Sequence, residues 1–273
     1  MKSYSTWLTA DINAKGVLDV DTVKGCTAGM AASVGGCYQN CYAARIAKFR
    51  GIDFTRAVAR RVYTKGQARK IRELVAAAPE GFFRVGTMGD PSHAWSHTAH
   101  IVEWLAPLAV PVIVTKHWLV ASDLDLVRLV RVGAVLNTSV SALDTDAQLS
   151  HRLAQLERYS ALGGVSVARV VSCAFLGSTH EAKRRREIQD KLLSMPGAID
   201  NPLRLPKSHP LVAGGVVEAT KALDLGDKPV SMSLHSPDSY LGHCSACPDK
   251  CGLARMLPTH PKPTEPQTKL FES

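Results

Sequence analysis

Six of the seven cysteines in this 273-residue sequence fall into two groups of three, one near each end. The first group is Cys26, Cys37 and Cys41, and the second is Cys244, Cys247 and Cys251. Thiolates are ligands of zinc and of iron-sulfur clusters. In a chain that stays in the reducing cytosol, such grouping favours metal binding over disulfide formation.

The first group lies in a glycine-rich loop that runs from Gly25 to Ala43. Three thiolates can hold three irons of a 4Fe-4S cluster and leave the fourth iron without a protein ligand. An open iron of this kind can bind S-adenosylmethionine (SAM) and pass it an electron, which is the chemistry of radical SAM enzymes. The spacing alone leaves open a zinc site and three unrelated buried cysteines. Zinc usually takes four ligands in short paired spacings, whereas ten residues separate Cys26 from Cys37.

The second group is compact, because Cys244 and Cys247 form a Cys-x-x-Cys pair and Cys251 follows four residues later. It resembles the ligand sets of auxiliary iron-sulfur clusters, with the preceding His243 or a substrate atom in the fourth position. A zinc knuckle, free thiols and one cluster shared with the first group are the alternatives. Cys173 stands alone on an expected strand and is interpreted as a core residue.

Several short motifs accompany the first cysteine loop, which ends in Cys41-Tyr42-Ala43. They are Gly86-Thr-Met-Gly-Asp90, Val114-Thr115-Lys116, Thr138-Ser139-Val140-Ser141 and Val171-Ser172-Cys173. Together they resemble a phage-associated family of radical SAM proteins, whose loop has the pattern Gly-Cys, Ser-x-Gly-Cys and Cys-Tyr-Ala. The likeness covers about residues 25 to 177. It departs in one extra residue between Cys37 and Cys41, and in Ala174-Phe175 where the family has Glu-Pro.

The resemblance implies that each matched motif ends a barrel strand and faces the active site. Cys26, Cys37 and Cys41 would then hold the SAM-binding 4Fe-4S cluster. The candidate catalytic residues are Asp90, Lys116 and His117. The residues expected to bind SAM are Tyr42, Thr87, Met88, Gly89, Asp90, Thr115, Ser139, Ser141 and Ser172. For each serine and threonine, local capping of the backbone is the alternative.

Candidate substrate-binding residues are His93, His235 and four consecutive cations at the start of an expected helix. The four cations are Lys183, Arg184, Arg185 and Arg186. They spread around a helix, so a solvated face is the alternative to a phosphate-binding patch. The formal charge of +9 and the isoelectric point near 9.3 favour an anionic partner, DNA or a modified nucleotide.

The elements that position these residues follow from an alternation of short apolar runs with amphipathic stretches, which is typical of βα units around a parallel sheet. The expected strands are Phe82 to Gly86, Val110 to Thr115, Ala134 to Val140, Val165 to Ser172 and Val230 to Leu234, with a weak strand before Cys26. The expected helices are Thr55 to Ala78, His97 to Ala109, Asp123 to Val132, Asp144 to Ala161 and Glu181 to Ser194. Ser194 to Gly215 is expected to be a long loop.

About six units are too few for a closed eight-fold barrel, so the sequence predicts an α/β fold of the partial, open TIM-like kind. We expect residues 1–240 to form a radical SAM partial barrel, and residues 241–273 a cysteine-rich segment with a mobile proline-rich tail. No run approaches the ~18 apolar residues of a membrane span, and the N-terminus lacks a signal-peptide core. We therefore expect no membrane partner and a cytoplasmic location, that of the host cell if a phage encodes the chain.

The sequence predicts a radical SAM enzyme, an isomerase or another radical catalyst, that works with an external electron donor. Its expected cofactors are a 4Fe-4S cluster, SAM and a second 4Fe-4S cluster or zinc. Phage relatives suggest DNA base hypermodification, such as isomerisation of an amino-acid-modified thymine. The alternatives are a zinc-stabilised nucleic-acid-binding protein without catalysis, and a radical SAM enzyme that acts on a peptide or small metabolite.

Overall fold

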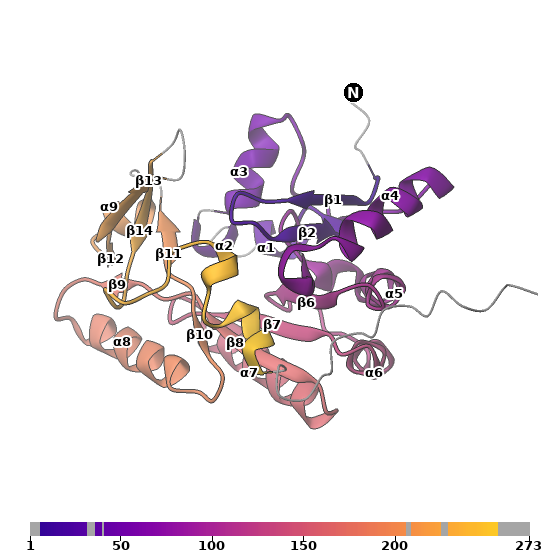
Figure 1. The fold of residues 1–273 in the computed structure, drawn as a ribbon. Helices are drawn as coiled ribbons and strands as arrows, with labels where there is room; N and C mark the ends of the chain where they lie inside the picture. Colours follow the sequence, from indigo (N-terminus) through magenta and orange to yellow (C-terminus); the bar gives the residue numbers. More distant parts are fainter. Residues whose placement is uncertain (1–5, 32–35, 40, 206–208, 225–228, 256–273) are drawn as a thin grey trace, which may run out of the picture.

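A seven-stranded, mostly parallel sheet forms the centre of the computed structural model, which describes residues 6–31, 36–39, 41–205, 209–224 and 229–255 (Figure 1). The sheet has the order β1-β2-β5-β6-β7-β8-β10, and only β1 within it runs antiparallel to its neighbour. The strands are β1 (Thr9–Ile12), β2 (Leu18–Asp21), β5 (Phe82–Val85), β6 (Val110–Thr115), β7 (Val135–Val140), β8 (Val165–Val170) and β10 (Ile199–Asp200). The six parallel strands follow one another in chain order, as consecutive βα units do. This α/β architecture is compatible with the expected open barrel.

Helices connect the parallel strands, and side-chain caps set where the longer ones begin. The longer helices are α3 (Tyr42–Phe49), α4 (Lys65–Ala76), α5 (Trp95–Leu105), α6 (Asp123–Arg131), α7 (Asp146–Ala161) and α8 (His180–Leu193). The shorter helical segments are α1 (Thr27–Ala31), α2 (Gly36–Gln39), α9 (Pro210–Ala213), η1 (Pro79–Gly81), η2 (Pro91–Ala94), η3 (Cys244–Ala246) and η4 (Lys250–Arg255). Ser122 caps α6, Thr179 caps α8, and Thr145 forms a reciprocal capping box with Gln148 at α7.

The two faces of the sheet are covered differently, because alternate residues of a strand point to opposite sides. On the outer face, Phe83, Ile113 and Leu136 join the core that includes side chains of α5 and α6. On the opposite face, which we call the inner face, Phe82, Val112, Val135 and Val167 pack with Cys251 and Leu253. The C-terminal segment drawn in yellow in Figure 1 therefore covers part of this inner face.

Two sequence predictions about strands are wrong. The expected strand at Val230 to Leu234 is β14 (Pro229–Ser233), but it lies outside the parallel sheet, between the antiparallel β11 (Leu203–Leu205) and β13 (Lys221–Asp224). The sixth parallel strand is β10, which pairs with β8 from within the expected long loop. β10 and β11 have only two and three residues, so no hydrophobic pattern marks them in the sequence. Pairing with β8 and β14, respectively, stabilises them.

The expected helix from Thr55 to Ala78 is also too long. Its first part forms β4 (Val58–Ala59), which pairs with β3 (Val23–Lys24), and the helix α4 begins only at Lys65. Thr64 has an extended backbone, and its side chain accepts a hydrogen bond from the Gln67 N–H, which fixes the helix start there. A smaller pair joins β9 (Ala174–Phe175) to β12 (Val217–Glu218).

Part of the cysteine-rich C-terminal segment packs on the inner face of the sheet. Cys251 and Leu253 of η4 lie against Val135 of β7 and Val167 of β8, and Cys244 packs at the edge of the same cluster. The proline-rich tail expected after Leu257 lies outside the described residues. Within the described ranges, no helix is long and apolar enough to cross a bilayer.

A close backbone contact fixes the first cysteine loop against the end of β5. A Cβ added to Gly89 would lie 2.5 Å from the carbonyl oxygen of Val23 and 2.8 Å from that of Gly25. We expect Gly89→Ala to push the loop from β5 and to lower the free energy of unfolding by roughly 1 to 3 kcal/mol. Gly66→Ala on α4, where a Cβ meets nothing within 4 Å, is the matched control and should be neutral or slightly stabilising. Equal urea midpoints for the two variants would contradict this account of the loop.

Candidate active site

The first cysteine loop is attached to the carboxyl end of β5 by its backbone. The Gly25 N–H donates to the Met88 carbonyl at 3.1 Å, and Gly25 also forms a parallel bridge with Gly89. The Thr87 and Met88 N–H groups in turn donate to one carboxylate oxygen of Asp21 at the end of β2. The loop thus lies at the edge of the sheet where parallel strands end, which is the edge that carries active sites in α/β barrels.

The three thiols of the first group lie beside one another in this loop. Interaction with the Cys37 side chain lowers the pKa of Cys41 to about 7. Burial, followed by the nearby charges of Asp90 and Cys37, raises the pKa of Cys26 to about 12. In the part of the chain that is described, no three His, Cys, Asp or Glu side chains stand ready to hold a metal ion. The thiols are therefore neighbours, while the arrangement as it stands is not a closed metal site.

The donor chemistry of the loop fits a cluster that binds at three sulfurs. Cys37 and Tyr38 both have left-handed backbone angles, with φ of 50° and 65°, which turns the chain sharply at the middle cysteine. Apolar side chains surround the sulfurs, since Cys26 and Cys41 belong to a cluster with Met30, Met88 and Trp118. Such surroundings limit access of water, as an oxygen-sensitive metal centre requires.

Thr87 is the clearest unsatisfied group next to this loop. Its hydroxyl is buried and has no hydrogen-bond partner within the described residues. An unpaired buried hydroxyl costs free energy, so such a group is stabilised when a ligand supplies the partner. Thr87 thus offers an unpaired hydroxyl at the end of β5.

Asp90, one of the expected catalytic residues, braces the ends of two strands. Its carboxylate accepts hydrogen bonds from the Ser92 N–H at 2.9 Å, the Thr115 hydroxyl at 2.7 Å and the Lys116 N–H at 2.8 Å. The Thr115 hydroxyl also accepts from the His117 N–H. Asp90 and Thr115 therefore have hydrogen-bond partners within the protein and act as local capping groups.

Lys116 lies in a buried charged network with Tyr38, Asp144 and Arg152. Its ammonium group hydrogen bonds to the Tyr38 hydroxyl and lies 3.6 Å from an Asp144 oxygen, while the Arg152 guanidinium is 2.5 Å from the same oxygen. The side chains of Lys116, Arg152 and Asp144 are 8%, 2% and 1% exposed. Burial lowers the pKa of Lys116, although Asp144 opposes this shift. Lys116 is therefore enclosed by partners and braces the cysteine loop through Tyr38.

His117 is also enclosed. It is 1% exposed, its Nε2 lies 3.0 Å from the Thr138 hydroxyl, and its ring packs against Trp95. Burial lowers the pKa of His117 to about 4, so the imidazole is neutral near pH 7. A hollow of about 230 Å³ is lined by Lys116, His117, Trp118, Ala147, Gln148, His151 and Arg152.

The three expected serines differ in how they are used. Ser141 donates to the Val171 carbonyl and Ser172 donates to Asp200, so both serve local structure. Ser139 is 8% exposed, lies in β7 and points to the inner face with Asn137 and Val135. Ser139 is thus the one of the three that stays placed to meet a ligand over the sheet.

The second cysteine group lies on the inner face among cations. Cys251 is buried with Phe82, Val135 and Val167, and Cys244 packs at the edge of the same cluster. The charge of Arg169 of β8 interacts with Cys251, and the charges of Arg84 and Lys15 act on Cys244. The three thiols also act on one another electrostatically. The Cys173 prediction is confirmed, because that residue is 1% exposed in the core.

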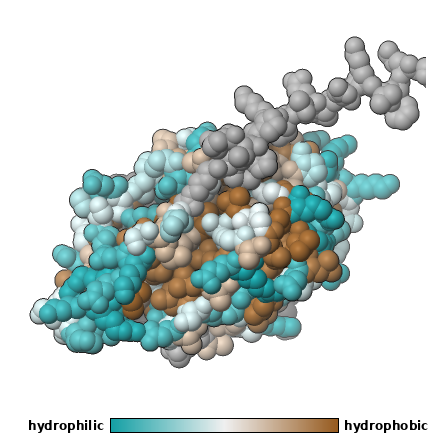
Figure 2. Space-filling view, turned by 90° about the horizontal axis from the view of Figure 1, so that it is seen from below, coloured by the Kyte–Doolittle hydropathy of each residue, from teal (hydrophilic) through white to brown (hydrophobic). Residues whose placement is uncertain are grey.

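Most cations at the start of α8 are engaged within the protein. Arg184 pairs with Asp146 at 2.5 Å, Arg185 pairs with Glu181 at 2.6 Å, and Arg186 donates to the carbonyls of Phe175 and Gly177. Lys183 is exposed. Seen from below, hydrophilic areas lie toward both ends of this face and apolar areas lie in the middle (Figure 2). This arrangement matches the solvated-face alternative better than a phosphate-binding patch.

The remaining expected site residues lie at separate places. Tyr42 is 55% exposed at the start of α3, directly after Cys41. His93 follows Asp90 in η2, and burial lowers its pKa. His235 receives a hydrogen bond from Gln189 and lies 3.4 Å from Asp190 of α8.

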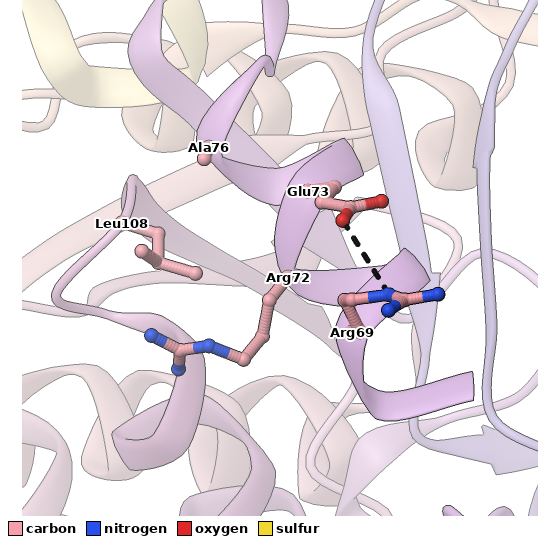
Figure 3. A pocket seen from close by; sticks show the side chains of 5 residues that line it. All are labelled: Arg69, Arg72, Glu73, Ala76 and Leu108. Carbon is pink, nitrogen blue, oxygen red and sulfur yellow. Dashed lines mark ion pairs between the residues drawn. The ribbon is translucent and has the colours of Figure 1, made fainter. Parts of the chain in front are cut away.

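A second surface hollow carries none of the expected chemistry. It measures about 510 Å³ and lies on the outside of α4, lined by Arg69, Arg72, Glu73, Ala76 and Leu108 (Figure 3). Its Arg69 and Glu73 form an exposed ion pair one helical turn apart, at 3.7 Å. Such a pair is typical of a helix surface and indicates no active site.

Sequence reasoning missed a group of cations that reach the inner face. They are Lys15, Arg84, Arg169 and Arg204. Two of them had a visible signal, because Arg84 and Arg169 are single charges within otherwise apolar strands of a parallel sheet, where charges are rare. Lys15 and Arg204 had none, since only the tertiary structure brings their segments to the same place.

Comparison with protein-family models, with curated proteins and with solved structures finds no match.

Proposed function

We propose that this protein is a radical SAM enzyme whose SAM-binding 4Fe-4S cluster is held by Cys26, Cys37 and Cys41. The observation that carries the proposal is the gathering of these thiols at the carboxyl-end edge of six consecutive parallel strands. When bound by these thiols, a 4Fe-4S cluster would supply the one-electron chemistry for reductive cleavage of SAM and so for abstraction of a substrate hydrogen. The resemblance of the loop and of the strand-end motifs supports the same function.

The protein groups around the loop would have defined roles in this function. Thr87, with its unpaired hydroxyl, and Ser139 are the groups best placed to contact SAM. Met88 and Trp118 would exclude water from the sulfurs. Asp90 and Lys116 would act as positioning residues, because their hydrogen bonds hold the ends of β5 and β6 and the middle of the cysteine loop.

The substrate we propose is a DNA base or a modified nucleotide, as in base hypermodification by isomerisation. The surplus of positive charge, +9 over the chain, supports an anionic substrate. An external reductant would supply the electron. A second cluster at Cys244, Cys247 and Cys251 is part of the proposal, with their grouping on the inner face as its support.

The test is anaerobic purification of the full chain, followed by reconstitution with ferrous iron and sulfide. We expect a brown protein with the electron paramagnetic resonance signal of a reduced 4Fe-4S cluster, a signal that SAM perturbs, and dithionite-dependent formation of 5′-deoxyadenosine. A protein that carries zinc in place of iron and takes up no cluster would instead be the metal-stabilised, non-catalytic nucleic-acid binder, and the proposal would fail.

A further inference from the structure

A cluster of four cations lies where the inner face of the sheet meets the C-terminal segment. Its members, which we call the basic cluster, are Lys15, Arg84, Arg169 and Arg204. Arg84 and Arg169 come from β5 and β8, Arg204 comes from β11, and Lys15 precedes β2. Contacts bring their segments together, because Arg169 hydrogen bonds to Asn201, three residues before Arg204, and the Lys15 carbonyl accepts from the Cys244 N–H beside the inner face. The charges of the four cations also act on one another.

The negative charge within the protein does not balance this cluster. Asp19 forms a two-point ion pair with Arg84, with contacts of 2.8 and 3.2 Å, whereas Lys15, Arg169 and Arg204 form no ion pair with a carboxylate of the described residues. Three positive charges are then left over. If three thiolates of the second cysteine group held zinc or a 4Fe-4S core, each of charge about +2, the site would add about one negative charge and leave two positive charges unmatched.

The unmatched groups are open to a ligand. Arg204 is exposed, and its guanidinium makes no hydrogen bond or ion pair with any residue that the structure describes. Arg169 is partly exposed and uses one guanidinium nitrogen on Asn201. Lys15 is partly exposed, and its ammonium makes one long contact, 3.3 Å, to the Leu241 carbonyl. Donors therefore remain free on three of the four cations.

A phosphate group matches this arrangement in both charge and geometry. A phosphate monoester carries about 1.5 to 2 negative charges near pH 7, and two successive phosphodiesters carry a similar total. Guanidinium groups bind phosphate oxygens through two parallel hydrogen bonds, and a lysine adds a point charge. A carboxylate, with a single charge, would leave the surplus only half balanced.

We propose that the basic cluster is a binding site for a phosphate group of the substrate. The substrate would then lie close to the first cysteine loop, because the charge of Arg204 interacts with Tyr42, the residue after Cys41. A nucleotide or a DNA strand held there by its phosphate would have its base near the first cysteine loop. This inference deepens the proposed function and rests on it for the identity of the reaction, but phosphate binding can be measured without any SAM cleavage.

The test is calorimetric titration of the reconstituted protein with thymidine monophosphate, thymidine and a short oligothymidylate. We expect Arg204→Gln to weaken binding of a phosphate-bearing probe about tenfold to a hundredfold, as loss of a charged hydrogen-bond pair does. The affinity of Arg204→Lys for the phosphate-bearing probe should lie between those of Arg204→Gln and the native protein. Lysine keeps the positive charge but lacks the paired donors of a guanidinium group. Arg69→Gln on α4, a cation that is 80% exposed, is the matched control and should bind as the native protein does.

The probes separate the two sources of phosphate. Preferred binding of the monophosphate identifies a nucleotide substrate, and preferred binding of the oligothymidylate identifies a DNA strand. Thymidine binding as tightly as both phosphate probes, or Arg204→Gln binding them like the native protein, would overturn the proposal. So would an Arg204→Gln variant that loses affinity for SAM alone, because the cation would then hold the SAM carboxylate.

Formation of 5′-deoxyadenosine by the same preparations keeps the two proposals apart. Native protein that binds phosphate through Arg204 but never cleaves SAM would retain the phosphate site and refute the radical SAM function. Native protein that cleaves SAM but binds thymidine as tightly as the phosphate-bearing probes would support the radical SAM function and refute the phosphate site. Lys15→Gln is the second variant, with the same expected loss, and circular dichroism confirms that each variant is folded before titration.

Discussion

Replacing Cys26, Cys37 or Cys41 by alanine is expected to abolish the reductive cleavage of SAM to 5′-deoxyadenosine. Each variant leaves two sulfurs for a cluster that needs three protein ligands, so the cluster is lost or cannot present its open iron. The measurement is 5′-deoxyadenosine formed with dithionite after anaerobic reconstitution, together with bound iron and sulfide. We expect product at the level of a protein-free control.

Two comparison variants make this expectation specific. Cys173→Ala removes a buried thiol that lies in a separate core cluster, so it should lower stability but leave SAM cleavage in place. The triple alanine variant of Cys244, Cys247 and Cys251 should lose about half of the bound iron if the second group holds an auxiliary cluster, while SAM still binds the first. Retained SAM cleavage in all three variants of the first group would show that the cluster is elsewhere.

The second large effect is expected from Asp144→Asn, which removes the carboxylate between two buried cations. Burial raises the pKa of Asp144, but the charges of Lys116 and Arg152 outweigh it and hold the pKa below its usual value. The carboxylate also accepts from the Tyr38 hydroxyl at 2.8 Å and from the Ser141 N–H at 2.9 Å. Without this charge, Lys116 and Arg152 remain buried with too little compensation, which typically costs about 3 to 5 kcal/mol.

Urea unfolding of Asp144→Asn measures this loss directly. Asp146→Asn is the matched control, because Asp146 forms an ion pair with Arg184 in which the carboxylate is 76% exposed. Pairs of this kind contribute at most about 1 kcal/mol. If the two variants lose the same stability, the buried network does not brace this part of the fold. Tyr38 links the network to Cys37, so Asp144→Asn should also weaken retention of the first cluster.

The local pattern was sufficient to predict the central strands. β5, β6, β7 and β8 lie within or next to their expected ranges, because each is a short run of β-branched and aromatic residues between turn signals. Helices α6, α7 and α8 also lie within one or two residues of their expected ranges, since Ser122, Thr145 and Thr179 mark their starts. Such signals are local, so they can be recognised in the sequence without knowledge of the fold.

The short strands depended on partners far away in the sequence. β10 has two residues and is a strand only because it pairs with β8, and β14 joins β11 and β13 rather than the parallel sheet. Two residues cannot show a periodicity for β10, and the pattern of the five residues of β14 does not reveal which strands it pairs with. Contacts between distant segments supplied the stabilisation that local propensity lacked.

By itself, the sequence determined the grouping of the cysteines, the order of the main βα units and the motifs that lie at strand ends, all of which depend on residue type and spacing. Only the tertiary structure decided how the site residues are used. It encloses Lys116 and His117 with partners, engages the arginines of α8, and leaves the Thr87 hydroxyl and the Arg204 guanidinium without hydrogen-bond partners among the described residues. Burial and partner geometry set the cost of each charge and hydroxyl, and neither can be read from residue order along the chain.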